Sequence, residues 1–124
     1  MLAEYDVGMC PWSPLGGGFL SGKYTRDEIP AGTRGAESDR FEDRYLTEEN
    51  FDVLDEVRAV ADEEDASPVQ VAIAWLLEQP TMTAPIIGAR TVDQLEENLG
   101  ATDMDLSEQQ VERLSEAKDA PSLV

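Results

Sequence analysis

The chain has 124 residues, of which 27 are Asp or Glu and 9 are Lys or Arg, so its formal net charge at pH 7 is -18. This length suits a single domain with a real core, but it is too short for a complete eight-stranded α/β barrel, which needs about 200 residues or more. A surface this acidic argues against nucleic acid and against an anionic membrane as partners, and no apolar run approaches the roughly 20 residues that a membrane span requires.

The acidic residues are dispersed along the chain, for example at 48–49, 62–65 and 96–97. Two interpretations stay open: a solvated surface that keeps a protein soluble in the molar salt of a halophile, and an acidic face that recruits a basic partner. The dispersal favours the first. The single Cys10 cannot form an internal disulfide and fits a reducing cytoplasm, and residues 1–4 show no beginning of a signal peptide.

Histidine is absent from the sequence. A mechanism that needs a histidine, in a Ser-His pair or as a metal ligand, is therefore incomplete in this chain. A single cysteine likewise excludes a thiolate zinc site, so no metal ligands are assigned.

The first expected element is a short strand at 5–10, which ends where Pro11 removes a ladder donor. A loop with three glycines follows at 13–18. Its backbone can approach a ligand closely, and its amides can bind phosphate oxygens. Lys23 adds a cation, and Trp12 offers a flat face for a planar ring. The alternative is a flexible connector that binds nothing.

Residues 25–46 are polar and contain Gly32 and Gly35. We interpret them as a long surface loop. A loop of this length is more often functional or disordered than idle.

Two helices are predicted next. Thr47 can cap the first, and its expected inward face holds Phe51, Leu54, Val57 and Ala61. Ser67 and Gln70 form a capping box for the second, with Pro68 at the first helical position. The apolar face of that helix consists of Val69, Ala72, Ile73 and Leu76.

A short buried strand is expected at 84–87, and two further helices follow it. Thr91 with Gln94, and Ser107 with Gln110, have the spacing of capping boxes. Gly100 is expected to terminate the first of these helices, whose apolar side carries Leu95 and Leu99.

The predicted order of strand, loop, two helices, strand, helix and helix is typical of parallel βα units, so the fold class is α/β. Two parallel strands make a poor independent sheet, because their faces and edges stay uncovered. The sequence therefore indicates a piece of a larger sheet.

A group of polar residues surrounds the start of the helix predicted after Thr91. Free amides at a helix N-terminus bind anions, and Arg90 beside them is unfavourable unless an anion joins it. A phosphate would resolve this conflict. Gln94, Glu97 and Asn98 lie on or beside one helical face and could hydrogen-bond a purine edge. The alternative is a capped surface helix with ordinary polar residues.

Three runs resemble the C-terminal part of the aldo-keto reductases, which are NADP-dependent (β/α)8 barrels: WSPLGGGFLSGKY at 12–24, SPVQVAIAWLLEQP at 67–80 and IIGARTVDQLEENL at 86–99. The branch that shares them includes voltage-gated potassium channel β subunits. The resemblance spans residues 5–118. It implies that residues 1–124 are the last βα units of a (β/α)8 TIM barrel, incomplete in this chain, with 25–46 as a loop within it.

The resemblance also implies a set of residues around NADP(H). It places an aromatic ring on the nicotinamide, the glycine loop over the pyrophosphate, and an arginine on the 2′-phosphate. The cofactor-binding residues that it implies are Trp12, Ser13, Pro14, Leu15, Gly16, Gly17, Lys23, Arg34, Gly88, Arg90, Gln94, Glu97 and Asn98.

The catalytic Asp, Tyr, Lys and His of that family lie in the first half of the barrel, so no catalytic residue is assigned in this chain. The leading hypothesis is the cofactor-binding part of an NADPH-dependent reductase that converts an aldehyde or ketone to an alcohol by hydride transfer, with the missing N-terminal barrel half as a partner. The alternatives are a non-catalytic NADP-binding or interaction module and an inactive truncated gene product.

Overall fold

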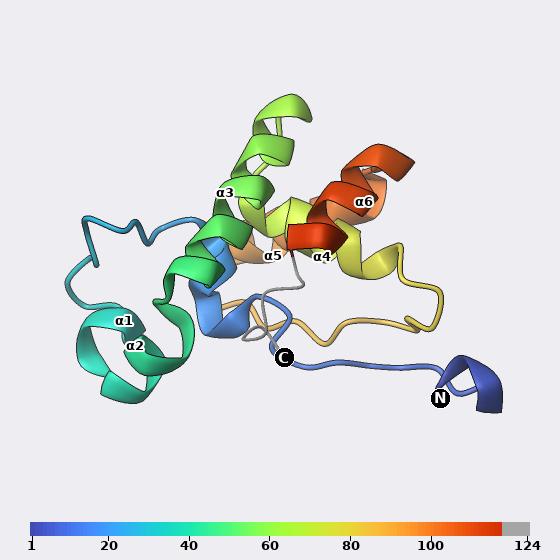
Figure 1. Ribbon diagram of the computed structural model, residues 1–124, viewed down its shortest axis with the longest axis horizontal. Helices are drawn as coiled ribbons and strands as arrows, with labels where there is room; N and C mark the ends of the chain where they lie inside the picture. Colours follow the sequence, from blue (N-terminus) through green and yellow to red (C-terminus); the bar gives the residue numbers. More distant parts are fainter. Residues whose placement is uncertain (118–124) are drawn as a thin grey trace.

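The computed structural model describes residues 1–117, and this part of the chain is mainly helical. The elements in chain order are η1 (Ala3–Tyr5), η2 (Gly16–Ser21), α1 (Arg34–Glu37), α2 (Asp39–Tyr45), α3 (Glu48–Glu63), α4 (Pro68–Leu77), α5 (Val92–Leu99), η3 (Gly100–Asp103) and α6 (Glu108–Ala117). The η elements are 3-10 helices. Figure 1 shows α1 and α2 at one end of the molecule and the N-terminal segment at the other.

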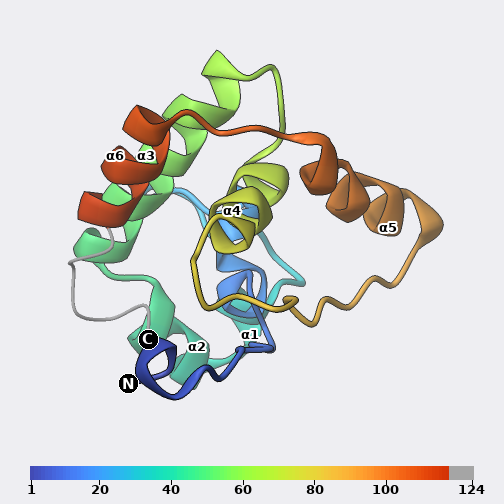
Figure 2. The ribbon, with the colours of Figure 1, turned by 90° about the vertical axis from the view of Figure 1, so that its right-hand side faces the viewer.

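The main core lies where α3, α4, η3 and α6 pack together (Figures 1 and 2). The inward face predicted for α3 is confirmed, because Phe51, Leu54, Val57 and Ala61 are all buried. Three of the four residues predicted for α4 are buried as well, and Leu76 is half-buried. The 3.6-residue period located the buried face of α3, whereas α4 also buries Val71 and Ala74, which the predicted face omitted.

Local hydrogen bonds at the helix starts confirm most of the predicted caps. The Thr47 hydroxyl accepts from the Asn50 amide at 3.3 Å. Ser67 and Gln70 form the reciprocal capping box on α4. The Ser107 amide donates to Gln110 Oε1 at 2.9 Å, and the Gln110 amide donates back to Ser107 Oγ at 3.2 Å.

Gly100 does not terminate α5 in the way predicted. Its φ is -58°, and the chain continues directly into η3. A Cβ at this position would overlap the side-chain amide of Gln70. A side chain at this position would displace the Gln70 side chain, so what constrains Gly100 is the neighbouring α4 and not a left-handed backbone.

The segment predicted as a long surface loop, 25–46, contains α1 and α2. The prediction fails because Phe41 is buried with Phe19, Tyr24, Phe51 and Leu54 in a second core cluster. A helix that buries an aromatic side chain is held by tertiary packing, which polar composition does not reveal.

The two expected strands form no sheet within the described residues. The segments 7–12 and 82–86 are joined by two isolated parallel bridges, Met9 with Met82 and Trp12 with Ile86. The parallel direction is as predicted, but the expected buried strand is wrong, since Ile86 is 56% exposed. Within the described residues, each segment has only the other as a bridge partner, so their outer edges are unpaired.

The apolar side of α5 also differs from the prediction. Leu95 and Leu99 are 43% and 51% exposed, whereas Asn98 is buried. Figure 2 shows α5 extending away from α3 and α6, with α4 as its helical neighbour. Among residues 1–117, no helix has both the length and the apolar character needed to cross a membrane.

An ion-pair network joins α6 to α3. Arg113 Nη1 lies 2.7 Å from Glu63 Oε1, and Arg113 Nε donates to Glu56 Oε1 at 2.7 Å. Hydrogen bonds from Arg113 and then from Gln110 lower the pKa of Glu63 below its ordinary value of 4.5. The folded-state pKa is thus below that of the unfolded chain, so this carboxylate stabilises the fold above about pH 4.5 and loses its effect as the pH falls through the folded value.

We therefore expect Glu63→Gln to lower the free energy of unfolding at neutral pH. The difference in this free energy between the variant and the wild type should become smaller as the pH falls below 4.5. Urea unfolding followed by circular dichroism across this range measures both. Glu112→Gln is the matched control, because Glu112 is an exposed glutamate of α6 with no ion pair among the described residues. If the two variants show the same pH profile, the network does not supply the stability assigned to it.

Candidate functional site

A cleft of about 460 Å³ lies where three segments distant in sequence meet. The glycine loop forms one wall, the start of α1 forms the second, and the segment leading into α5 forms the third. The lining residues are Ser13, Pro14, Leu15, Gly17, Gly18, Lys23, Gly32, Thr33, Arg34, Glu37, Ile86, Ile87, Gly88, Arg90 and Gln94. This volume is in the range of small-molecule sites.

The glycine loop is built from left-handed backbone conformations. Gly16, Gly17 and Gly18 have φ of 58°, 66° and 101°, and Ser13 also has a positive φ of 56°. The loop is closed by its own hydrogen bonds. The Gly16 and Gly18 amides donate to the Ser13 and Leu15 carbonyls, and the Gly17 amide donates to Ser13 Oγ at 3.3 Å.

These bonds correct one expectation. The three glycine amides are already engaged within the loop, so they do not form an open nest for phosphate oxygens. What the glycines provide instead is room for neighbouring side chains. A Cβ on Gly17 would lie 3.1 Å from Phe41 Cε2 and 3.5 Å from Arg34 Nη1, and one on Gly18 would lie 3.5 Å from Lys23 Nζ. The loop thus brings two cations against its own backbone.

The start of α5 provides a second group of anion-binding atoms. The Thr91 hydroxyl accepts from the Gln94 amide at 3.2 Å, while Gln94 Oε1 accepts from the Arg90 amide at 2.9 Å. The Thr91 half of the predicted capping box therefore forms, while the return bond from Gln94 goes to the Arg90 amide in place of the Thr91 amide. The amides of residues 91–93 donate no hydrogen bond within the described chain. They and Arg90 carry positive charge at the same helix end.

The cations of this chain fall into two groups. Arg26, Arg58 and Arg113 form ion pairs, and Arg26 alone contacts three carboxylates of α3. The other five cations within residues 1–117 form no ion pair with described residues. They are Lys23, Arg34, Arg40, Arg44 and Arg90.

Three of these five cations, Lys23, Arg34 and Arg90, line the cleft, and Glu37 is the one acidic residue in the described part of its lining. A chain with 27 acidic residues could neutralise each of them, so a cleft that collects uncompensated cations favours an anionic ligand.

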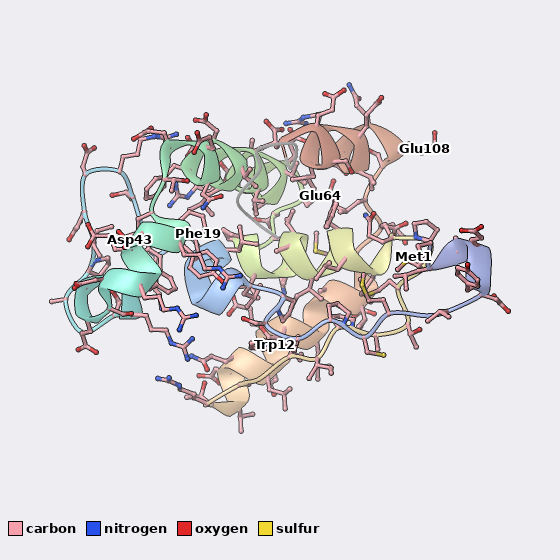
Figure 3. The ribbon with its side chains drawn as sticks, turned by 60° about the horizontal axis from the view of Figure 1, so that its bottom comes forward. Met1, Trp12, Phe19, Asp43, Glu64 and Glu108 are labelled. Carbon is pink, nitrogen blue, oxygen red and sulfur yellow. The ribbon has the colours of Figure 1, made fainter. Side chains whose placement is uncertain are left out.

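Most residues predicted to bind a cofactor line this cleft, but four do not. Trp12 is 81% exposed and lies beside the segment that leads into α5 (Figure 3). Gly16 packs beneath Tyr45. Glu97 is half-buried on α5, and Asn98 is buried, which does not fit its proposed contact with a purine edge.

Six lining residues were absent from the predicted set. Gly18 had a usable signal as the third glycine of the loop. The remaining five, Gly32, Thr33, Glu37, Ile86 and Ile87, reach the cleft through the path of segments 30–37 and 82–88. Within residues 1–117, no group of three or more Cys, Asp or Glu side chains is arranged to hold a metal ion.

Comparison with known proteins gives a consistent result. The family model described as "Aldo/keto reductase family" matches residues 1–119. The chain is 37% identical over 119 residues to the uncharacterized oxidoreductase YrpG of Bacillus subtilis, covering 95% of this chain and 34% of that protein. It is 31% identical over 122 residues to the aldo-keto reductase yakc [NADP(+)] of Schizosaccharomyces pombe, covering 98% and 36%.

A third relative, a probable voltage-gated potassium channel subunit beta of Oryza sativa, is 33% identical over 106 residues, which cover 84% of this chain and 32% of that protein. The chain therefore spans about a third of the length of the relatives that it matches.

Proposed function

Because this chain belongs to the aldo/keto reductase family, we propose that its cleft binds the phosphate-bearing part of NADP(H) and that the chain is the cofactor-binding part of a carbonyl reductase. A relative whose printed name includes NADP(+) supports the choice of cofactor. The observation that carries the proposal is the convergence of Lys23, Arg34 and Arg90 on one cleft, where they form no ion pair with a described carboxylate.

Arg90 and the open amides of residues 91–93 suit the 2′-phosphate. A phosphate there receives hydrogen bonds from the helix start and a charge-assisted pair from the guanidinium. It also removes the unfavourable placement of a cation beside the positive end of α5. NAD(H) has a hydroxyl at that position and offers no such compensation. This end of the cleft therefore favours NADP(H).

Lys23 and Arg34 suit the pyrophosphate at the opposite wall. Both lie against the glycine loop, where a Cβ on Gly17 or Gly18 would approach their nitrogen atoms to 3.5 Å. The Ser13 hydroxyl faces the same loop. Since the loop amides are internally bonded, the two side-chain cations supply most of the neutralising charge.

Bound NADPH would supply the hydride for reduction of an aldehyde or ketone. The residues of this chain would hold and orient it, and the exposed ring of Trp12 lies next to Ser13 for a planar group to stack on. The chain has no histidine, and a complementary N-terminal barrel half is the partner we propose for the acid-base residues. The exposed Val7, Met9 and Ile86 are apolar surface that such a partner would cover.

Isothermal titration of the 124-residue chain with NADPH and NADH tests the proposal. We expect NADPH to bind more tightly than NADH, by about tenfold or more, since only NADPH offers a phosphate to Arg90. Its affinity should fall as salt is raised, because the contacts are ionic. Equal affinity for both dinucleotides, or no binding of either, contradicts the proposed cofactor site.

A further inference from the structure

A second hollow of about 230 Å³ adjoins the cleft and shares Arg34 with it. It is lined by Arg34, Ser38, Arg40, Phe41, Arg44 and Tyr45. We propose that this hollow, which we name the α2 hollow, binds a small ligand that combines an aromatic ring with a phosphate or carboxylate group. Its volume admits one substituted ring but not a dinucleotide. The proposal does not depend on the cofactor assigned to the cleft.

The charge of the α2 hollow is the first argument. Arg34, Arg40 and Arg44 form no ion pair and donate no side-chain hydrogen bond within the described residues, although Asp39, Glu42 and other acids neighbour them in sequence. Three guanidinium groups around one small space repel one another, and an anion relieves that repulsion. In a chain of net charge -18, this is an unexpected place for unpaired positive charge.

The aromatic residues of α2 are the second argument. Phe41 and Tyr45 are four residues apart, so they lie on one side of the helix, with ring centroids 4.8 Å apart at 45°. Arg44 holds its guanidinium 5.3 Å from the Tyr45 ring centroid. The half-buried Tyr45 ring, with the buried Phe41 beside it and the Arg44 guanidinium over it, fits a ligand that is apolar and flat at one end and anionic at the other.

The α2 hollow is also held in place by buried contacts. Ser38 Oγ accepts from the Phe41 amide at 3.3 Å and caps α2. At the other end of α2, the buried Asn50 donates to the carbonyls of Arg44 and Tyr45 at 3.2 and 3.0 Å. Both helix ends are therefore fixed before a ligand arrives, which reduces the entropy cost of binding. Figure 3 shows nitrogen-bearing side chains in the space between α2 and α5.

The test titrates the full chain with phenyl phosphate, benzoate, inorganic phosphate and benzyl alcohol at constant ionic strength, by calorimetry. We expect phenyl phosphate or benzoate to bind at least about tenfold more tightly than inorganic phosphate or benzyl alcohol, because only the first two offer both a ring and an anion. Which of the two binds better identifies the anionic group.

Variants then locate the site. Arg40→Ala and Arg44→Ala should each weaken the binding of phenyl phosphate by about tenfold, and by clearly more than Arg90→Ala, which changes the net charge equally but lines only the cleft. Arg40 and Arg44 are exposed, so these changes leave the core intact. The proposal is overturned if inorganic phosphate binds as well as phenyl phosphate, if neither aromatic anion binds, or if Arg90→Ala weakens phenyl phosphate while Arg40→Ala does not. A failure of NADPH to bind the cleft does not contradict the proposal for the α2 hollow.

Discussion

Replacing Arg90 with alanine is expected to weaken NADPH binding to this chain by about 10- to 100-fold and to leave NADH binding within about twofold. A hydrogen bond to a charged group contributes about 1.5–3 kcal/mol, and Arg90 is the cleft cation at the start of α5. The guanidinium forms no ion pair in the described chain, so its removal leaves no carboxylate unpartnered. Titration calorimetry on both dinucleotides measures the difference.

Two further variants define what Arg90 contributes. Arg40→Ala changes the net charge by the same amount but lies in the α2 hollow, so it separates a specific contact from the general field of the chain. Arg90→Lys keeps the charge but cannot form a bidentate pair with a phosphate, so we expect its affinity for NADPH to lie between those of the wild type and Arg90→Ala. If Arg90→Ala weakens the binding of NADPH and of NADH equally, Arg90 does not contact the 2′-phosphate.

Replacing Phe19 with alanine is expected to reduce the free energy of unfolding by about 3–5 kcal/mol. The Phe19 side chain is 0% exposed, and its ring contacts those of Tyr24, Tyr45 and Phe51, with centroids 6.2, 6.3 and 5.4 Å away. Its loss opens a cavity between η2, α2 and α3. Because domains of this size have about 5–15 kcal/mol of stability, the change is a large part of the total. Urea unfolding measures it.

Phe19→Leu is the matched comparison, because it retains most of the apolar volume and should cost clearly less. Phe19 also supports the wall of the cleft, since it belongs to η2 with Gly17 and Gly18. We therefore expect the alanine variant to lose NADPH affinity as well. A loss of stability below about 1 kcal/mol would show that the aromatic cluster is not a core of this chain.

Local chemistry was readable from the sequence with no knowledge of the fold. The caps at Thr47, Ser67 and Ser107 need only residues that lie within one helical turn of each other. Periodicity alone gave the centre of the buried face of α3, but it missed Val71 and Ala74 of α4, which are buried as well. The resemblance gave most of the cleft as well, because its two outer runs supply the glycine loop and the start of α5.

The remaining features depend on which segments meet, and only the tertiary structure decided them. The Gln70 side chain of α4 lies against Gly100, and the helical state of 34–45 depends on Phe41 packing into a buried aromatic cluster. The two predicted strands form only isolated bridges, because a sheet needs further paired strands and these come from other parts of a sequence. The sequence by itself determined the starts of α3, α4, α5 and α6, an inward face for α3, and that cations accompany the glycine loop and α5. The tertiary structure decided that Lys23, Arg34 and Arg90 share one cleft, because residues so far apart converge only when the intervening helices pack.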